Sequence, residues 1–199
     1  MPDDHALRVV LIVELLLLFP MTAYHRIKAR TYEKLDRRQE GLFVLSTMRP
    51  MAGVFFTGAV VYLVNPALMT WSSVPLPMWV RWSGTGVLAL CWGLLFWTLR
   101  RLGRNLTDTV VTRKEHTLVT SGPYRWVRHP FYDALALLLI AIALVAANWF
   151  LLLTGAMFFV LIAIRSRTEE AKLAARFGES YRVYRSRTGR FLPRIGREQ

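Results

Sequence analysis

Apolar and charged residues are separated along this chain into long blocks. Apolar residues fill four stretches, 6–24, 51–69, 78–99 and 131–164, and basic residues crowd the segments between them. A soluble domain mixes the two classes finely, and a disordered chain would not reach the mean hydropathy of +0.31. Because about 20 apolar residues match the thickness of a bilayer, the sequence predicts a membrane protein.

The fourth block, 131–164, is too long for a single span. A polar residue, Asn148, interrupts it beside Trp149, an aromatic residue suited to the membrane interface. We therefore expect a tight helical hairpin there. The predicted fold is an all-α polytopic membrane protein with about five transmembrane helices, the last two a tight hairpin, plus a cytoplasmic connecting segment and C-terminal helices.

The distribution of positive charge predicts the orientation. The chain has 26 Lys and Arg against 13 Asp and Glu, a net charge of +13. Six basic residues lie in 25–41, seven in 100–130 and ten from position 165 onward, whereas the other connections carry almost none. Since Lys and Arg near span ends accumulate in the cytoplasm, we expect an outside N-terminus and a cytoplasmic C-terminus, in a bacterial inner membrane.

The sequence argues against nucleic-acid binding, against disulfide or thiolate-metal sites, and against a cleaved signal peptide. The basic segments adjoin spans and contain no recognition helix, so anionic lipid is a simpler partner than nucleic acid. The single cysteine, Cys91, excludes an internal disulfide and a metal site built on thiolates. The first block has one basic residue, Arg8, and no cleavage site of small residues after it, so it is expected to be a retained span and not a signal peptide.

A first polar motif precedes the fourth block. The stretch 107–119 is rich in Thr and Val and favours extended backbone, and a Gly-Pro turn at 122–123 follows it. If the next helix begins near Arg128, then Arg128 and Tyr132 share one helical face, with Pro130 in the first turn. A helix N-terminus beside Arg125 and Arg128 suits a carboxylate. The alternative is that these side chains only anchor the helix at the membrane interface.

A second motif follows the fifth predicted span. The helix is expected to continue out of the membrane, end at Gly178 and restart, which places Tyr181 and Tyr184 on one side. Glu169 and Glu170 form an adjacent acidic pair in a basic tail. They line a ligand site or, alternatively, pair locally, since Arg165 and Lys172 stand at helical spacing from Glu169.

Together the two motifs carry a family likeness. The first reads Gly-Pro-Tyr-Arg-Trp-Val-Arg-His-Pro-Phe-Tyr over 122–132, and the second is the Glu pair followed by Leu173, Phe177, Gly178, Tyr181 and Tyr184. In this order they resemble the isoprenylcysteine carboxyl methyltransferase and phospholipid methyltransferase superfamily, over about 102–193. The resemblance implies an integral membrane enzyme that uses S-adenosylmethionine (SAM).

The same resemblance implies that two parts of one membrane domain, 1–199, have different roles. Three N-terminal spans in 1–99 would give the acceptor access, and 100–199 would be the cofactor-binding half. The implied adenine contacts are His116, Leu118 and Val119. The implied contacts to the methionine part are Gly122, Tyr124, Arg128, His129, Pro130 and Tyr132. Glu169 or Glu170 would accept hydrogen bonds from the ribose, and Tyr181, Tyr184 and Arg190 would close the pocket.

The methyl acceptor is left open by the sequence. Arg190 and Arg49 are candidates to orient a carboxylate, and Asp133, Glu14 and Asp108 are candidates for an amine or a thiol, because ionisable residues at membrane depth are functional candidates by default. We expect in-line methyl transfer from SAM to a lipid-soluble or small acceptor. Two alternatives stay open: an NADPH-dependent enzyme like the sterol reductases, and a noncatalytic membrane scaffold. The oligomeric state is not predicted.

Overall fold

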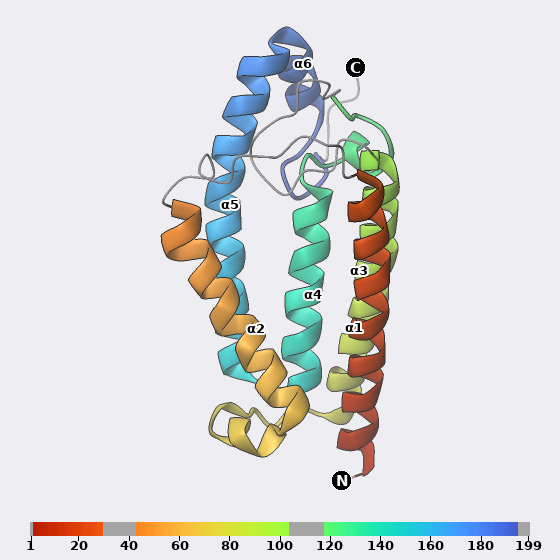
Figure 1. The fold of residues 1–199 in the computed structure, drawn as a ribbon, viewed down its shortest axis with the longest axis vertical. Coiled ribbons are helices and arrows are strands. Elements are labelled where there is room, and N and C mark those ends of the chain that lie inside the picture. The colour runs from red at the N-terminus through yellow and green to blue at the C-terminus, as the bar shows by residue number, and fades with distance from the viewer. Residues whose placement is uncertain (1, 30–42, 104–117, 195–199) are drawn as a thin grey trace.

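The fold is a bundle of long helices with a short helix at one end (Figure 1). The computed structural model describes residues 2–29, 43–103 and 118–194. The long helices are α1 (Pro2–Ala29), α2 (Arg49–Val64), α3 (Met78–Leu102), α4 (Pro130–Ala146) and α5 (Trp149–Phe177). Within these described ranges, four helices are long and apolar enough to cross a membrane, and α4 is a shorter apolar helix of 17 residues. The predicted all-α polytopic membrane fold is therefore confirmed.

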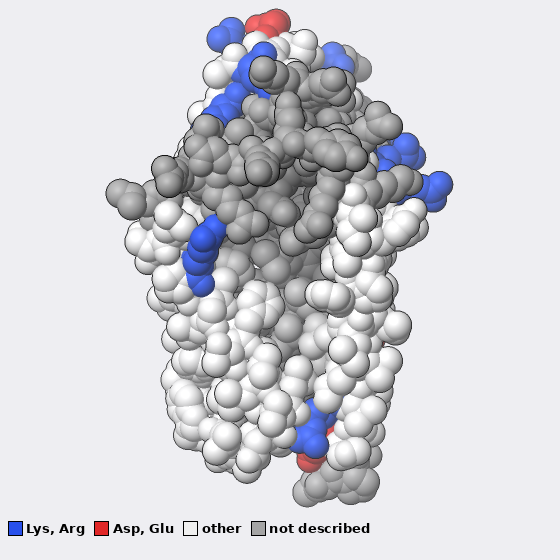
Figure 2. All heavy atoms as spheres, viewed as in Figure 1, with Lys and Arg blue, Asp and Glu red and all other residues white. Residues whose placement is uncertain are grey.

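The helices pack in an order that differs from their order in the chain. The α3 helix lies along α4, α4 packs on α5, α2 packs on α5, and α1 lies against α3 and α4. The short helix α6 (Glu179–Arg187) follows α5 at the end of the bundle opposite to the start of α1 (Figure 1). Most of the described basic side chains gather at the α6 end, above a wide band without charge (Figure 2).

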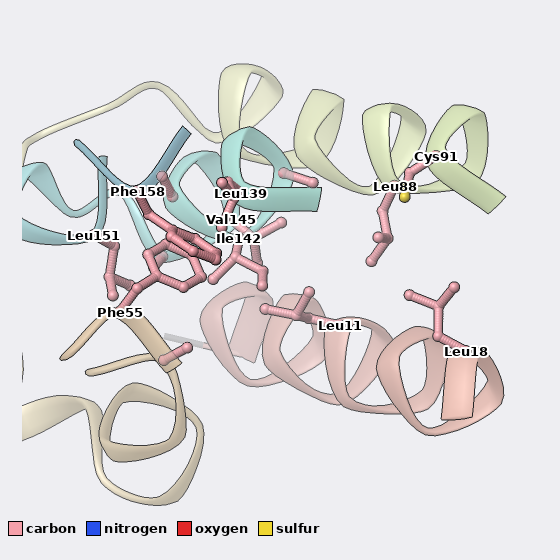
Figure 3. Close-up of a cluster of buried hydrophobic side chains, with 14 of the residues drawn as sticks. Leu11, Leu18, Phe55, Leu88, Cys91, Leu139, Ile142, Val145, Leu151 and Phe158 are labelled. Carbon is pink, nitrogen blue, oxygen red and sulfur yellow. The ribbon is translucent and has the colours of Figure 1, made fainter. Parts of the chain in front are cut away.

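The core of the bundle is aliphatic and aromatic. Leu11 and Leu18 of α1 point toward α3 and α4, and Phe55 of α2 meets Phe158 of α5 (Figure 3). The outward faces are also apolar, since Phe19 and Leu90 are 75% and 66% exposed. An outward face of this kind is stable only where hydrocarbon, not water, is the solvent.

Asn148 makes the hairpin between α4 and α5. Ala147 ends α4 with a φ of 47°, and Asn148 is extended and caps α5, its Oδ1 accepting from the Leu151 amide at 3.1 Å. Its Nδ2 donates to Ser72 Oγ at 2.8 Å. Asn148 therefore lies between the two helices, caps α5 and binds the segment that ends at Ser72. The predicted hairpin at this position is confirmed.

The second apolar block differs from its predicted extent of 51–69. A π-helical turn, η2 (Val44–Met48), precedes α2, and α2 ends at Val64. Asn65 is extended, and a 3-10 helix, η3 (Pro66–Ser72), follows. The residue before a proline is driven out of the helical region, so Pro66 stops α2 five residues before the apolar block ends.

The close approach of α3 to α4 depends on Gly84. A Cβ there would stand 2.8 Å from a methyl group of Val145 and 3.0 Å from the Ala141 carbonyl oxygen, whereas a Cβ on Gly86 would meet nothing within 4 Å. Gly84 is thus used inside the bundle, in the manner of small residues at membrane helix contacts.

Gly84→Ala should destabilise the bundle by about 1–3 kcal/mol, because the added methyl group forces α3 away from α4. Gly86→Ala is the matched control on the same helix and should leave stability unchanged or slightly higher. Thermal unfolding of both variants in detergent measures the difference. Equal unfolding midpoints would contradict the assigned contact.

Candidate functional site

The first motif joins the start of α4. Helix α4 begins at Pro130, and His129 precedes it with φ −125° and ψ 54°. Arg128 therefore lies outside the helix, so the expectation that Arg128 and Tyr132 share a helical face is wrong: Pro130 fixes the first turn and the chain before it is not helical. Instead, the rings of His129 and Tyr132 stack, with centroids 5.3 Å apart and an angle of 10° between planes.

A short parallel bridge ties this motif to the C-terminal segment. Val127 pairs with Gly189, the Arg128 amide donates to the Gly189 carbonyl at 2.9 Å, and the His129 amide donates to the Arg190 carbonyl at 3.1 Å. A Cβ on Gly189 would overlap the Leu192 carbonyl, so only glycine fits there. Sequence reasoning missed Gly189 because a lone glycine in a basic tail gives no sign of its distant partner.

Glu170 is the centre of the site. Its side chain is only 3% exposed on α5. Arg190 binds it as a fork, with Nε donating to Oε1 at 3.1 Å and Nη2 donating to Oε2 at 3.0 Å. Arg128 Nε donates to Oε1 at 2.9 Å, and His129 Nε2 lies 3.2 Å from the same oxygen. One buried carboxylate thus holds together side chains from three segments.

Arg128 extends this network to the end of α6. Its Nη1 donates to the carbonyl oxygens of Thr188 and Arg185. The Thr188 hydroxyl in turn donates to the Tyr184 carbonyl at 2.8 Å. The guanidinium of Arg128 therefore links the buried carboxylate of α5 to the last turn of α6.

Glu169 has a separate set of partners. The Tyr132 hydroxyl donates to its Oε1 at 2.7 Å, and Arg165 pairs with the same oxygen at 3.1 Å. His129 Nδ1 lies 3.9 Å from Oε2, so the imidazole stands between the two carboxylates. The predicted local pair with Arg165 is present, while Glu170 reaches across to other segments.

A cavity of about 120 Å³ opens beside this network. The residues that line it come from α3, both motifs and α6: Leu102, Leu118, Val119, Tyr124, Arg128, His129, Leu173, Phe177, Tyr181 and Tyr184. Most of them are residues that the sequence assigns to a cofactor. Leu102, Leu173 and Phe177 were not assigned, although the last two stand one helical turn apart in the second motif.

Three tyrosines shape the cavity. The Tyr184 hydroxyl donates to the Tyr124 carbonyl at 2.7 Å. The Tyr181 hydroxyl is buried and has no hydrogen-bond partner among the described residues. Burial raises the pKa of Tyr181 to about 12 and raises the pKa of Tyr124 and of Tyr184 well above that of an ordinary phenol. All three therefore stay neutral, and Tyr181 keeps an unused hydroxyl beside the cavity.

The remaining predicted site residues lie around this centre or apart from it. Gly122 begins a 3-10 turn with a φ of +67°, and Pro130 is buried at the start of α4. Arg190 binds Glu170 through Nε and Nη2. Asp133 lies in the first turn of α4, and no hydrogen bond or ion pair joins its carboxylate to another described residue.

The other acceptor candidates do not join the cluster. Arg49 is exposed at the first position of α2, and contacts among the described residues do not connect it to Glu170. Glu14 lies on the inward face of α1, seven residues after Leu7, and its Oε2 is buried without a hydrogen-bond partner among the described residues. His116 and Asp108 lie outside the described residues.

One family of known proteins matches the middle of the chain. A model of the isoprenylcysteine carboxyl methyltransferase (ICMT) family matches residues 84–175, a range that contains both the start of α4 and the Glu pair. Over this region, which is just under half of its length, the chain is similar to the isoprenylcysteine carboxyl methyltransferase family.

Several curated proteins are similar to this chain. The cobalt-zinc-cadmium resistance protein CzcN of Cupriavidus metallidurans is 36% identical over 119 residues, which cover 58% of this chain and 55% of that protein. The protein-S-isoprenylcysteine O-methyltransferase of Schizosaccharomyces pombe is 31% identical over 57% of this chain and 49% of its own length. The mouse protein of the same name is 33% identical over 58% and 43%. The chain spans about half the length of these relatives.

A solved structure shares the fold. The eukaryotic intramembrane Ras methyltransferase ICMT aligns with a TM-score of 0.51 and 23% identity, over 81% of this chain and 55% of that one. The structural match extends beyond the region of the family model. It therefore includes helices for which sequence reasoning found no motif.

Glu170→Gln should lower the free energy of unfolding by about 3–5 kcal/mol, because it leaves buried guanidinium groups without their anion. The matched control is Glu179→Gln on α6, which breaks an ion pair with Arg182 in which both side chains are about three-quarters exposed. That exposed pair should contribute nothing measurable. Denaturant unfolding of both variants in detergent, without ligands, tests this, and equal midpoints would show that the Glu170 network is not structural.

Proposed function

We propose that this protein is an integral membrane methyltransferase that binds SAM in the cavity beside Glu170. The observation that carries the proposal is an overlap between the residues assigned from the sequence motifs and the residues that line the cavity in the structure. The residues that the motifs assign to a cofactor, among them Tyr124, His129 and Tyr184, are also residues that line one cavity. The similarity of residues 84–175 to the isoprenylcysteine carboxyl methyltransferase family supports the same activity.

The chemistry of the cavity walls fits this cofactor. Leu102, Leu118 and Phe177 offer apolar surface for the faces of an adenine ring. Tyr181 is 1% exposed and has an unpaired hydroxyl, which a polar ligand atom would satisfy. Arg128 lines the cavity, and its hydrogen bonds to described residues use Nε and Nη1, so its Nη2 is the donor that suits the carboxylate of an amino acid.

The Glu170 network would act by positioning. Glu170 holds Arg128 and His129 in one arrangement before any ligand binds, so these side chains need not be ordered on binding. Glu170 is therefore proposed as a positioning residue, and a direct ribose contact is left to Glu169 or to the hydroxyl of Tyr181. Bound SAM would supply an electrophilic methyl group on a sulfonium. The chain would supply orientation and a site shielded from water, without a covalent enzyme intermediate.

The acceptor is proposed to be an amine or a thiol, soluble in lipid or small. Arg190, the candidate for orienting a carboxylate, is occupied by Glu170. Asp133 lies one turn after His129, and its carboxylate has no partner among the described residues. A carboxylate there attracts a cationic amine or accepts a proton from a nucleophile, but it repels an anionic acceptor.

The orientation of the protein in the membrane is proposed from the charge at the α6 end of the bundle. Described basic side chains concentrate around α6, where the cavity also lies (Figure 2). We propose that this end faces the cytoplasm, so that the soluble cofactor enters from there and a lipid-soluble acceptor enters sideways from the bilayer. The N-terminus would then lie outside.

Calorimetry on the detergent-purified protein tests the cofactor directly. SAM and its demethylated product should bind with saturation, and NADPH, the control, should not. Binding of NADPH alone would replace the proposal with a reductase, and binding of neither by folded protein would favour a scaffold. Tyr181→Phe should weaken SAM binding by about 3- to 10-fold, the loss of one hydrogen bond. Tyr24→Phe, on an exposed side chain of α1, is the matched control and should bind as the wild type does.

Asp133→Asn should lower the rate of methyl transfer to an amine or thiol by about 100-fold, within the range for general acid–base groups, while SAM binding stays unchanged. The measurement is transfer of a radiolabelled methyl group to a panel of lipid-soluble amines, thiols and carboxylic acids. A carboxylic acid as the preferred acceptor, with full activity in the variant, would overturn the assigned acceptor class without touching the cofactor proposal.

A further inference from the structure

The far end of the bundle holds a second polar cavity, of about 380 Å³. It lies where α1 begins, where α2 gives way to η3 and where α3 begins, and its polar walls include Asp4, Arg8, Tyr62, Thr70 and Arg81. Helix α4 separates it from the Glu170 site. At 1.5 Å per residue, the 17 residues of α4 span about 25 Å, so the two sites are far apart.

Arg81 is fixed in the wall of this cavity. Its side chain is 13% exposed, and its charge is paired with Asp4. Its Nε donates to the Val145 carbonyl at 3.1 Å, and its Nη2 donates to the Tyr62 hydroxyl at 3.4 Å. The α1, α2, α3 and α4 helices therefore meet at this guanidinium, and the Asp4 carboxylate is used by it.

Arg8 gives the cavity an excess of positive charge. It lines the same space, but no hydrogen bond or ion pair joins its guanidinium to another described residue. Asp4 is the one acidic residue in the described wall, so two guanidinium groups face one carboxylate. A partly buried arginine beside an open cavity is stabilised by an anion that fills it.

The position of the cavity in the membrane indicates where such an anion comes from. Exposed tryptophans surround this end of the bundle: Trp71, Trp79, Trp82 and Trp149. Tryptophan collects at the level of the lipid headgroups. Figure 2 shows basic and acidic atoms together at this end, below the uncharged band. The cavity therefore opens at headgroup depth.

We propose that this cavity is a phosphate-binding site that takes the headgroup phosphate of a phospholipid in the leaflet opposite to α6. Arg8 supplies the free charge and a planar fork of donors, which matches two phosphate oxygens. Arg81 and Tyr62 hold the opposite wall in place. Free phosphate offers the same oxygens. The exposed tryptophans at this end of the bundle favour the lipid, because their apolar surface can also contact its chains.

The experiment measures the thermal unfolding midpoint of the delipidated full chain in detergent, titrated with three probes. These are a short-chain phosphatidylglycerol, inorganic phosphate, and a diacylglycerol with the same chains but no phosphate. The lipid should raise the midpoint with saturation, and the diacylglycerol should not. A rise with inorganic phosphate at equal concentration would assign the site to a free oxyanion and overturn the lipid source.

Arg8→Gln should weaken the response to phosphatidylglycerol by about 10-fold, because it removes charge-assisted hydrogen bonds to phosphate. Arg8→Lys, which keeps the charge but loses the fork, should be intermediate. Arg182→Gln on α6 is the control for loss of one positive charge and should respond as the wild type does. An equal response of Arg8→Gln and the wild type would overturn the site. SAM binding by Arg8→Gln should be unchanged, so this test does not depend on the proposed methyl transfer.

Discussion

The arrangement of the α6 end depends on one buried carboxylate. Glu170 would be unstable alone at 3% exposure. Arg128 and Arg190 compensate its charge, and His129 lies within hydrogen-bond distance. Because Arg128 comes from before α4 and Arg190 from after α6, the ion pairs also fix the path of the chain. The parallel bridge at Val127 and the cavity beside it follow from that closure.

A bundle in hydrocarbon cannot be stabilised by hiding its apolar residues, because its outer surface is equally apolar. Here the bundle is stabilised by close helix contacts and by polar groups that are hydrogen-bonded. Gly84 lets α3 approach α4. At the break between α4 and α5, the Asn148 side chain accepts from the Leu151 amide and donates to Ser72. The two ends of the bundle then hold the described ion pairs, Glu170 with its partners at one end and Asp4 with Arg81 at the other.

The two ends differ in how their charges are balanced. At the α6 end, Glu170 is surrounded by more cations than it can neutralise, and the cavity there has largely apolar walls with a few polar groups. At the opposite end, Asp4 neutralises Arg81 and leaves Arg8 available. A soluble ligand with an apolar ring suits the first arrangement, and a headgroup anion suits the second.

The sequence by itself determined the features that depend on neighbouring residues. Apolar blocks specified the spans, Asn148 the hairpin, Pro130 the start of α4 and Gly178 the break before α6, since hydropathy and helix termination act within a few residues. Of the extended segment predicted over 107–119, residues 107–117 lie outside the described residues. The helical face expected for Arg128 and Tyr132 did not form.

Only the tertiary structure decided which charges meet. Glu170 is 42 residues from Arg128 and 20 from Arg190, and Asp4 is 77 residues from Arg81. A basic chain offers each carboxylate many possible partners at similar spacing, so the pattern alone cannot choose among them. The choice is made by helix packing, which carries distant segments to one point and leaves Arg8 and Asp133 without partners among the described residues.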